Sequence, residues 1–392
     1  MKVLIVADGD TKYGASHALC QMAMNLQLKP DIEITVIVNQ ESEAADYLRK
    51  IGCEVICVSY EPFYVIWPKY LWKLPIKYIV YGIKYLSGRL FAISNLQTKI
   101  KLESFDLIHS NSSREDLSAA IAINYNIPLV WHIREFGDED FKCFSLRKDY
   151  IQLMNSTANV FIAVSEAVKR HWIKKGLNGQ KIVKVYDGVK SRKQSVVRKT
   201  DLKQKKNINL VMTGSLQSTK GQEQAIAMMV KLKDEKISYH LDIIGDGAQQ
   251  YTKRLKQMIS KFDVKDSVRL LGYRTDVYEI LPSYDIGLMC SKSEGFGLVT
   301  AEYMMAGLAV LASDSGANKE LIREGIDGYL YNYGNVEDMK QKLLKIIANN
   351  LGGDKTHKYA MNNFSSKLNA ERIYNVYKTL LDNRNLNSDN KL

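Results

Sequence analysis

Two glutamates in the second half of this 392-residue chain have the types and spacing to bind a nucleotide or a sugar. Glu294 and Glu302 are separated by seven residues, and Gly295 and Gly297 lie between them. The apolar run 285–290 precedes them, so we expect this loop at the C-terminal edge of a parallel strand, where open α/β sheets bind ligands. If a helix begins just after the second glycine, its first-turn amides can bind anionic oxygen. The two carboxylates would then flank one pocket, one for sugar hydroxyls and the other for ribose hydroxyls.

The longer string 293–330 resembles the signature of the retaining glycosyltransferase family 4. In that signature an E-x7-E element is followed by a glycine-containing helix, a strand, a G-x-x-E turn and a D/N-G element. The chain supplies residues of these types in order at Glu294, Glu302, Gly307, Gly316, Glu320 and Gly328, with three residues instead of two between Gly316 and Glu320. The resemblance implies the GT-B fold, in which two Rossmann-like α/β domains with parallel sheets face a central cleft. It also implies a retaining glycosyltransferase similar to those of bacterial capsule and exopolysaccharide synthesis.

A second loop, 213–221, resembles the phosphate-contacting loop of the same family, with Lys220 in the lysine position. Such a lysine would neutralise charge on the departing diphosphate. Ser215 stands where the family commonly has an arginine, so Arg274 could supply the missing cation. The segment 272–276 lies where the backbone of family members contacts the base. The resemblance assigns donor binding to Gly14, Ser16, Gly214, Ser215, Lys220, Gly272, Tyr273, Arg274, Glu294, Gly295, Phe296, Gly297, Leu298 and Glu302.

The first half of the chain resembles the family more weakly. Residues 13–16 (YGAS) follow the first expected strand and resemble the glycine-rich loop that meets the donor diphosphate, with alanine in place of one glycine. His132 ends an expected strand where the family often has a histidine that reaches the donor sugar. A lone histidine is more often structural, yet its place at a strand end favours a site role, and Arg134 and Glu135 could line the same site. The catalytic roles thus fall to His132, Lys220 and Glu294.

Two short aspartate motifs could suggest a metal. Asp8 with Asp10, and Asp138 with Asp140, both read as DxD. We interpret both as loop chemistry, because no cluster of histidine, cysteine and aspartate has metal-ligand spacing. We therefore expect no metal or other cofactor, the nucleotide sugar being a substrate. An NAD site is disfavoured, since no GxGxxG follows the first strand.

The chain is too long for one ordinary core, because single cores stop growing near roughly 250 to 300 residues. Short apolar runs alternate with helical patterns, which is typical of βαβ units and parallel sheets. We expect an acceptor-binding domain at 1–189, a basic linker at 190–206 and a nucleotide-sugar domain at 207–370. A C-terminal helix and tail at 371–392 could pack back on the first domain. The expected strands are 3–7, 34–38, 54–58, 106–110, 128–133, 160–164 and 182–186, then 209–213, 240–244, 268–271, 285–290, 309–312 and 328–331.

The formal charge of +12 indicates an anionic partner: nucleic acid, a membrane or a phosphorylated substrate. The segment 62–100 contains six basic residues, many aromatic ones and no acidic residue. In a helix its lysines form one stripe, although Pro68 and Pro75 would break or kink that helix, and the charges exclude a membrane span. The segment is either an interfacial helix or a helical pair packed on its own domain. The membrane-facing residues would be Trp67, Lys69, Trp72, Lys73, Lys77 and Lys84.

Five scattered cysteines without a CxxC pair favour a reducing compartment, and the N-terminal run lacks the pattern of a signal peptide. We expect a cytoplasmic protein, peripheral on the inner face of the cytoplasmic membrane. Its partners would be a nucleotide-sugar donor, a saccharide or lipid-linked saccharide acceptor and the anionic membrane. Nucleic acid is not expected, because no recognisable binding module is present. A nucleotide-sugar epimerase on the same fold remains the alternative function.

Overall fold

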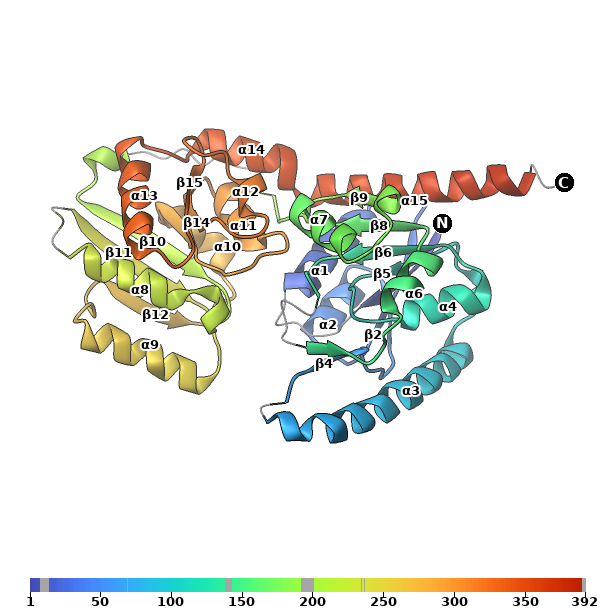
Figure 1. Ribbon diagram of the computed structural model, residues 1–392. Coiled ribbons are helices and arrows are strands. Elements are labelled where there is room, and N and C mark those ends of the chain that lie inside the picture. The colour runs from blue at the N-terminus through green and yellow to red at the C-terminus, as the bar shows by residue number, and fades with distance from the viewer. Residues whose placement is uncertain are drawn as a thin grey trace. The chain divides into compact units, whose positions relative to one another are not determined.

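The computed structural model describes residues 1–7, 14–68, 70–137, 143–191, 201–233, 235 and 237–389 (Figure 1). The chain forms two compact units, one of Met1–Gly188 with Ser366–Leu392 and the other of Val189–Ser365. The boundary at which the chain passes from the first unit to the second, between Gly188 and Val189, therefore lies just before the linker expected at 190–206. Residues 366–370, which the sequence placed in the second domain, belong to the first unit.

The first unit is built on a seven-stranded sheet in the order β3-β2-β1-β5-β6-β8-β9, with every pair parallel. Its strands are almost wholly apolar, which parallel strands require because helices cover both faces. The strands are β1 (Lys2–Ala7), β2 (Glu33–Val38), β3 (Glu54–Cys57), β5 (Leu107–Ser110), β6 (Leu129–Ile133), β8 (Val160–Ala163) and β9 (Ile182–Lys184). The helices are α1 (Gly14–Leu26), α2 (Glu43–Lys50), α3 (Leu74–Lys99), α4 (Leu117–Tyr125), α6 (Tyr150–Thr157), α7 (Glu166–Lys174) and α15 (Ser366–Asp389).

The second unit carries a six-stranded parallel sheet in the order β12-β11-β10-β13-β14-β15. Its strands are β10 (Asn207–Thr213), β11 (Ser238–Ile244), β12 (Val268–Gly272), β13 (Ile286–Met289), β14 (Ala309–Ser313) and β15 (Gly328–Tyr331). Its helices are α8 (Gln222–Lys231), α9 (Gln249–Lys261), α10 (Val277–Ile280), α11 (Leu298–Met305), α12 (Asn318–Leu321), α13 (Val336–Ala348) and α14 (Asp354–Phe364). Every strand expected from the sequence is present, which confirms two parallel α/β sheets.

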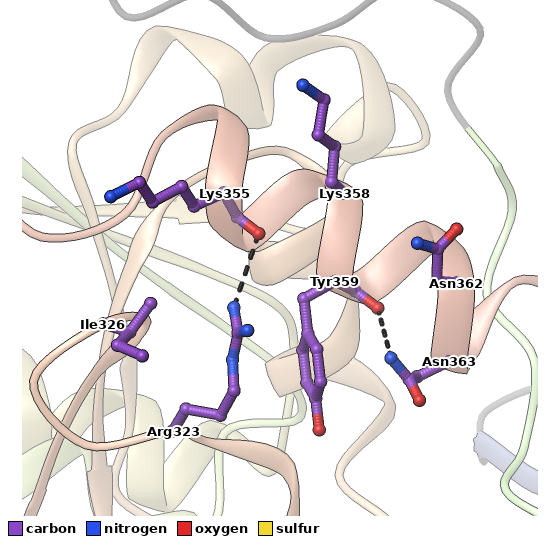
Figure 2. Close-up of a pocket in the computed structure, with 7 residues that line it drawn as sticks. All are labelled: Arg323, Ile326, Lys355, Lys358, Tyr359, Asn362 and Asn363. Carbon is purple, nitrogen blue, oxygen red and sulfur yellow. Dashed lines mark hydrogen bonds between the residues drawn. The ribbon is translucent and has the colours of Figure 1, made fainter.

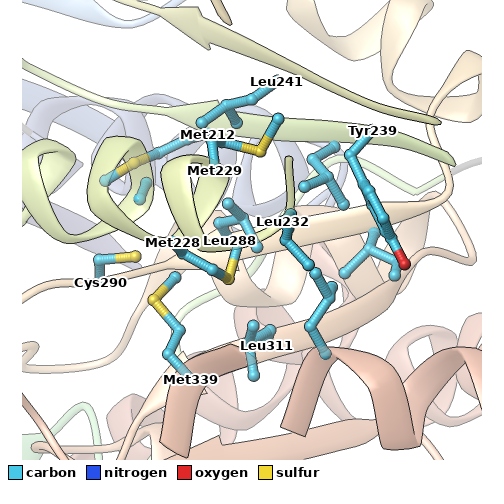
Figure 3. Close-up of a cluster of buried hydrophobic side chains, with 14 of the residues drawn as sticks. Met212, Met228, Met229, Leu232, Tyr239, Leu241, Leu288, Cys290, Leu311 and Met339 are labelled. Carbon is cyan, nitrogen blue, oxygen red and sulfur yellow. The ribbon is translucent and has the colours of Figure 1, made fainter. Parts of the chain in front are cut away.

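Methionines fill much of the core of the second unit (Figure 3). Met212 of β10 and Leu288 of β13 meet Met228 and Met229 of α8 in one buried cluster, which Met339 of α13 closes. Methionine suits this place because its flexible thioether fills irregular gaps. The cluster holds β10 and β13 together, and the loops after these two strands carry the candidate site.

Helix α3 runs from Leu74 to Lys99 with Pro75 in its first turn (Figure 1). The helix expected to carry the whole lysine stripe is interrupted here, because Leu71–Lys73 form a separate 3₁₀ turn and α3 begins only at Leu74. After Pro75 the helix continues without a kink at this residue, since a proline in the first helical turn interrupts no helical hydrogen bond. The helix begins too late to include Pro68, so the expected lysine stripe is only partly helical. Only Tyr85, Ala92 and Leu96 of α3 are buried. Nearby, β4 (Tyr64–Ile66) and β7 (Cys143–Ser145) form a small antiparallel sheet that the sequence did not predict.

The C-terminal helix α15 packs against α1 within the first unit. Ile373 and Tyr377 are fully buried in the same core as Leu19 and Met22 of α1. Across the helices of the described part of the chain, none is both long and apolar enough to cross a membrane.

Candidate functional site

The strand order of the second unit reverses between β10 and β13, and this is where the candidate site lies. At such a switch point two neighbouring loops diverge and leave a ligand site at the carboxyl ends of the strands. The loop after β10 carries Lys220, and the loop after β13 carries Glu294. Lys220 Nζ lies 2.6 Å from Glu294 Oε1, and the two side chains are 31% and 13% exposed. The structure thus joins two residues that were assigned separately from the sequence.

Glycines allow the loops around this ion pair to approach one another closely. Gly316 has φ +55°, and a Cβ there would lie 2.2 Å from the carbonyl oxygen of Glu294. Ala317 N donates to that same oxygen at 3.0 Å. Gly221 has φ +77°, and a Cβ on it would lie 2.2 Å from the carbonyl oxygen of Cys290. No larger residue fits at either place without moving a loop.

Helix α11 begins at Leu298, four residues after Glu294, so its first-turn amides lie next to the loop that carries Glu294, and Glu302 follows one turn further on. Its N-cap is Gly297, which has φ +88° and no side chain to accept from those amides. Such amides have no intrahelical acceptor and can bind an anion. Tyr303 fixes the helix to the end of β10, because its hydroxyl accepts from Thr213 N at 2.7 Å. Burial raises the pKa of the Glu302 carboxyl to about 7, although the side chain as a whole is partly exposed.

Asn318 is a site residue that the sequence did not single out. Its Oδ1 accepts from Thr300 Oγ1 at 3.0 Å and its Nδ2 donates to Ser313 O at 3.2 Å. The buried amide therefore ties the first turn of α11 to the loop after β14. The only signal in the sequence was its position between Gly316 and Glu320, two residues of the family signature.

Several other expected donor residues have defined surroundings. Phe296 is buried with its ring 5.8 Å from that of Phe364, so only its backbone is left for a ligand. Arg274 Nε donates to Asp276 at 2.8 Å. The cation expected to replace the family arginine is therefore already paired with a carboxylate. Tyr273 is 70% exposed. Ser215 Oγ accepts from Gln217 at 3.0 Å.

The glycines of the neighbouring loops have the positive φ angles expected of ligand-binding turns. Gly214 has φ +137° and Gly272 has φ +72°. A Cβ on Gly245 would lie 1.9 Å from the carbonyl oxygen of Gly214, so the loops after β10 and β11 also touch. Gly295 and Leu298 flank the buried Phe296 and Gly297.

In the first unit, His132 is the next-to-last residue of β6 and is fully buried in a polar cluster. Its Nδ1 lies 3.3 Å from His109 Nε2 and 3.3 Å from Arg134 Nη2. Arg134 in turn forms a buried ion pair with Asp187 and donates to Asn111 Oδ1 at 3.0 Å. Burial first, and then Arg134 and His109, lower the pKa of His132 well below its ordinary value. His132 is therefore a neutral imidazole at physiological pH.

Glu135, which the sequence also placed near His132, is buried in the first unit, where its carboxylate accepts hydrogen bonds from the loop after β5. Its Oε1 accepts from Ser113 N at 2.8 Å and from Ser112 Oγ at 3.0 Å. Gly14 opens α1, and the side chain of Ser16 is buried on that helix.

The aspartate motifs at 8–10 and 138–140, together with Tyr13 and Lys69, lie outside the described residues. Within the described ranges, no group of three or more histidine, cysteine, aspartate or glutamate side chains could hold a metal ion.

A pocket of about 410 Å³ in the second unit contains none of the expected site residues (Figure 2). Arg323 dominates it, with its guanidinium 3.9 Å from the centre of the Tyr359 ring. That guanidinium already donates to both carboxylate oxygens of Asp327 at 2.8 Å. Because its strongest cation is satisfied by an internal carboxylate, we assign no ligand to this pocket.

Comparison with known proteins finds glycosyltransferase families over most of the chain. A family model described as "Glycosyl transferases group 1" matches residues 193–365, and one described as "Glycosyltransferase Family 4" matches residues 42–193. The crystal structure of Anabaena HepE in complex with UDP-glucose has a TM-score of 0.75 and 20% identity, covering 97% of this chain and 100% of that chain. The fold is thus that of the GT-B glycosyltransferases. The chain belongs to the glycosyltransferases of family 4.

Among the curated relatives, an uncharacterised Haemophilus influenzae glycosyltransferase is 26% identical over 234 residues, which are 59% of this chain. The match spans 64% of that relative's length. The Escherichia coli UDP-Gal:α-D-GlcNAc-diphosphoundecaprenol α-1,3-galactosyltransferase is 24% identical over 311 residues, covering 75% of this chain and 80% of the relative.

Proposed function

We propose that this chain is a retaining glycosyltransferase that moves a sugar from a UDP-sugar to a lipid-linked saccharide during bacterial surface polysaccharide synthesis. The observation that carries the proposal is the Lys220–Glu294 pair at the switch point, beside the first turn of α11. A cation, a carboxylate and helix amides at one sheet edge are the groups that a diphosphate and a sugar require. The UDP-glucose complex of HepE and the UDP-galactose donor of the E. coli relative support a uridine donor.

Each group of this site has a separate task. Lys220 and the first-turn amides of α11 stabilise the charge that develops on the leaving diphosphate. Glu294 accepts from hydroxyls of the donor sugar, and Glu302, when ionised, accepts from the ribose diol. The diphosphate must compete with Glu294 for Lys220, so donor binding exchanges one ionic partner of this lysine for another.

Retention follows if both exchanges at the anomeric carbon occur on one face of the sugar. The acceptor oxygen bonds to the anomeric carbon on the side from which the diphosphate oxygen departs. The proton of the acceptor hydroxyl passes to the leaving phosphate oxygen, and UDP is released. No protein carboxylate acts as a nucleophile, and no metal is needed for the charge balance that Lys220 and the amides supply.

We propose that the first unit, which is expected to bind the acceptor, docks on the cytoplasmic face of the membrane through α3. Ile79, Ile83, Leu86 and Leu90 recur at helical spacing and are 61%, 64%, 60% and 71% exposed. Trp67 and Trp72, which precede α3 in the chain, are 43% and 70% exposed. Monomeric proteins rarely expose so large an apolar surface without a partner. The other reading, a helical pair buried on its own domain, is disfavoured because α3 buries so few residues.

Lysines beside this face complement an anionic lipid surface. Lys73 Nζ lies 5.1 Å from the centre of the Trp72 ring, and Lys77 and Lys84 lie 5.3 and 5.5 Å from that of Tyr81. Aromatic rings capped by cations are suited to the headgroup level, with the aliphatic stripe below it. Asp116 anchors the helix from behind, since it accepts from Arg89 at 3.1 Å and from the hydroxyl of Tyr85.

A donor screen tests the catalytic part. UDP-, GDP- and dTDP-sugars are incubated with and without a lipid-diphosphate saccharide, and released nucleotide and the anomeric configuration of the product are measured. We expect turnover with a UDP-sugar and a product that keeps the donor's configuration. Conversion of the donor sugar without acceptor would instead establish the epimerase, and turnover confined to GDP- or dTDP-sugars would overturn the uridine assignment.

Liposome sedimentation tests the membrane part. The wild type should sediment with anionic vesicles, and exchanging Ile79, Ile83 and Leu86 for serine should abolish this sedimentation. Reversing the charge of Lys69, Lys73, Lys77 and Lys84 to glutamate should abolish sedimentation at low salt. Reversing Lys253, Lys256, Lys261 and Lys265 to glutamate is the matched control, because it makes the same charge change on exposed residues of the other unit. A wild type that ignores vesicles at low salt, or a dimer that the serine variant dissociates, would refute docking to lipid.

A further inference from the structure

Two lysines of helix α3 carry positive charge that no carboxylate in the described part of the chain neutralises. Lys77 Nζ lies 5.3 Å from the centre of the Tyr81 ring, and Lys84 Nζ lies 5.5 Å from the same point. Spacings of four and three residues place the three side chains on one side of the helix. The segment 62–100 contains no acidic residue, so no helical neighbour can pair with either ammonium. Cations gathered without a counter-charge indicate an anionic ligand.

The side chains of this lysine–tyrosine cluster have hydrogen-bond donors to spare. Lys77 Nζ donates to the carbonyl oxygen of Ile66 at 2.6 Å, which holds the ammonium in place and leaves its other N–H groups. Among the described residues, the ammonium of Lys84 and the hydroxyl of Tyr81 have no hydrogen-bond partner. Lys84 is exposed, and Lys77 and Tyr81 are half-buried, so a ligand can reach all three. Two ammoniums and a phenol can therefore donate to several oxygens of one ligand.

The unpaired charge lies on one edge of the exposed apolar face of α3. Helical geometry places Lys77 and Lys84 on one side of Ile83 and Arg89 on the other side. Arg89 donates to the buried carboxylate of Asp116 at 3.1 Å, so its charge is already paired. A uniformly anionic lipid surface attracts cations on both edges of a helix alike. The one-sided arrangement therefore favours a discrete anionic group that binds beside the apolar face.

The ligand that fits this place is an amphiphile with adjacent phosphates. The apolar face of α3, with Ile79 and Ile83 at its centre, meets the hydrocarbon when the helix docks, so the cluster lies where the hydrocarbon ends. A lipid-linked diphosphate carries both of its phosphates at that level, and its oxygens can contact both ammoniums and the phenol at once. A phospholipid with a single phosphate has fewer oxygens for these donors, and a soluble anion gains nothing from the apolar face.

We propose that Lys77, Tyr81 and Lys84 form a binding site for the diphosphate of the lipid-linked acceptor. The inference rests on the proposed function, because the class of acceptor and the docking through α3 come from there. It adds a discrete site to that docking, since lysines that only attract anionic lipid would not distinguish a diphosphate from other headgroups. The site lies wholly within the first unit and holds the lipid end of the acceptor at a fixed position on α3.

The test is sedimentation of the full-length protein with phosphatidylcholine vesicles that contain either undecaprenyl diphosphate or phosphatidylglycerol at equal total charge. The wild type should bind the diphosphate vesicles about tenfold more tightly. Lys77→Gln combined with Lys84→Gln should remove this preference, and Tyr81→Phe, which deletes only the hydroxyl, should reduce it. Lys99→Gln combined with Lys101→Gln is the matched control, because it removes two exposed lysines at the other end of the same segment.

The outcomes separate this site from the docking on which it depends. Equal affinity of the wild type for the two kinds of vesicle would overturn the diphosphate site and leave the docking of α3 intact, whereas binding to neither would overturn both. A preference that the double glutamine variant retains, or that the control loses equally, would also overturn the site. Complete displacement by inorganic diphosphate at the concentration of the lipid would assign the cluster to a soluble anion instead. Melting temperatures of all variants show that a lost preference is not a loss of fold.

Discussion

Replacing Glu302 with glutamine removes a carboxyl whose pKa burial raises from the ordinary 4.5 to about 7. A shift of this size corresponds to about 3 kcal/mol between the protonated and ionised forms. The folded chain therefore holds the proton more tightly than the unfolded chain does. This contribution to stability is fully present below about pH 4.5 and is lost as the pH rises through about 7.

Glutamine does not titrate, so the free energy of unfolding of Glu302→Gln should not show the decrease that the wild type shows as the pH rises from about 4.5 through about 7. At pH 8 the variant should be more stable than the wild type by up to about 3 kcal/mol, and at pH 4.5 the two should be nearly equal. The value is an upper limit, because water reaches part of the side chain. Urea denaturation at both pH values measures the difference, with Glu279→Gln, an exposed carboxylate of the same unit, as the control.

Donor binding should show the opposite sign. Only the carboxylate accepts from both ribose hydroxyls, so the affinity for UDP-glucose should rise about tenfold between pH 6 and pH 8 and level off above. A UDP-sugar is the appropriate probe, because the terminal phosphate of free UDP itself titrates near pH 6. Calorimetry with Glu302→Gln should give weaker binding without that pH dependence. A wild-type affinity that is flat across this range, with equal stability differences at both pH values, would refute the role of Glu302.

Three further predictions follow from the same site. Lys220→Ala should lower turnover by about 100-fold or more while leaving the melting temperature nearly unchanged. Lys292→Ala, which removes an exposed lysine of the neighbouring loop, should leave turnover unchanged, and near-normal activity of Lys220→Ala would remove Lys220 from the site. Dialysis against EDTA should leave turnover unchanged, and a loss restored by Mg²⁺ or Mn²⁺ would return a role to an aspartate motif. Gly316→Ala should displace the Glu294 backbone and lower donor turnover, whereas Gly334→Ala, with φ +85° and open space around it, should cost stability only; equal kinetics for the two would show that crowding of Glu294 is unimportant.

The sequence by itself determined the architecture, and it named the main candidate site residues. Buried parallel strands must be apolar throughout, so their runs were visible without periodicity analysis. The loops that follow β10 and β13 were then known to lie at the carboxyl edge. Lys220 and Glu294, which are 74 residues apart, could both be named, and the fold brought them to 2.6 Å.

The sequence could not determine which apolar face of α3 is buried. Its residues are apolar on more than one side, and periodicity alone does not say which side meets the protein. The tertiary structure buries Tyr85, Ala92 and Leu96 and leaves Ile79 and Ile83 exposed. Neighbouring elements decide this, because Asp116 and its arginines hold the Tyr85 side of the helix.

Only the tertiary structure brought together the buried polar groups around the candidate residues His132 and Arg134. Tyr377 meets His109 across 268 residues, and Asp187 meets Arg134 across 53. No local pattern marks such residues, since each would be an ordinary helix or loop residue in another setting. A buried donor or acceptor must find a partner among the groups that the strand order places beside it. That order exists only in the folded chain, so the motifs could be found in the sequence but the groups that orient them could not.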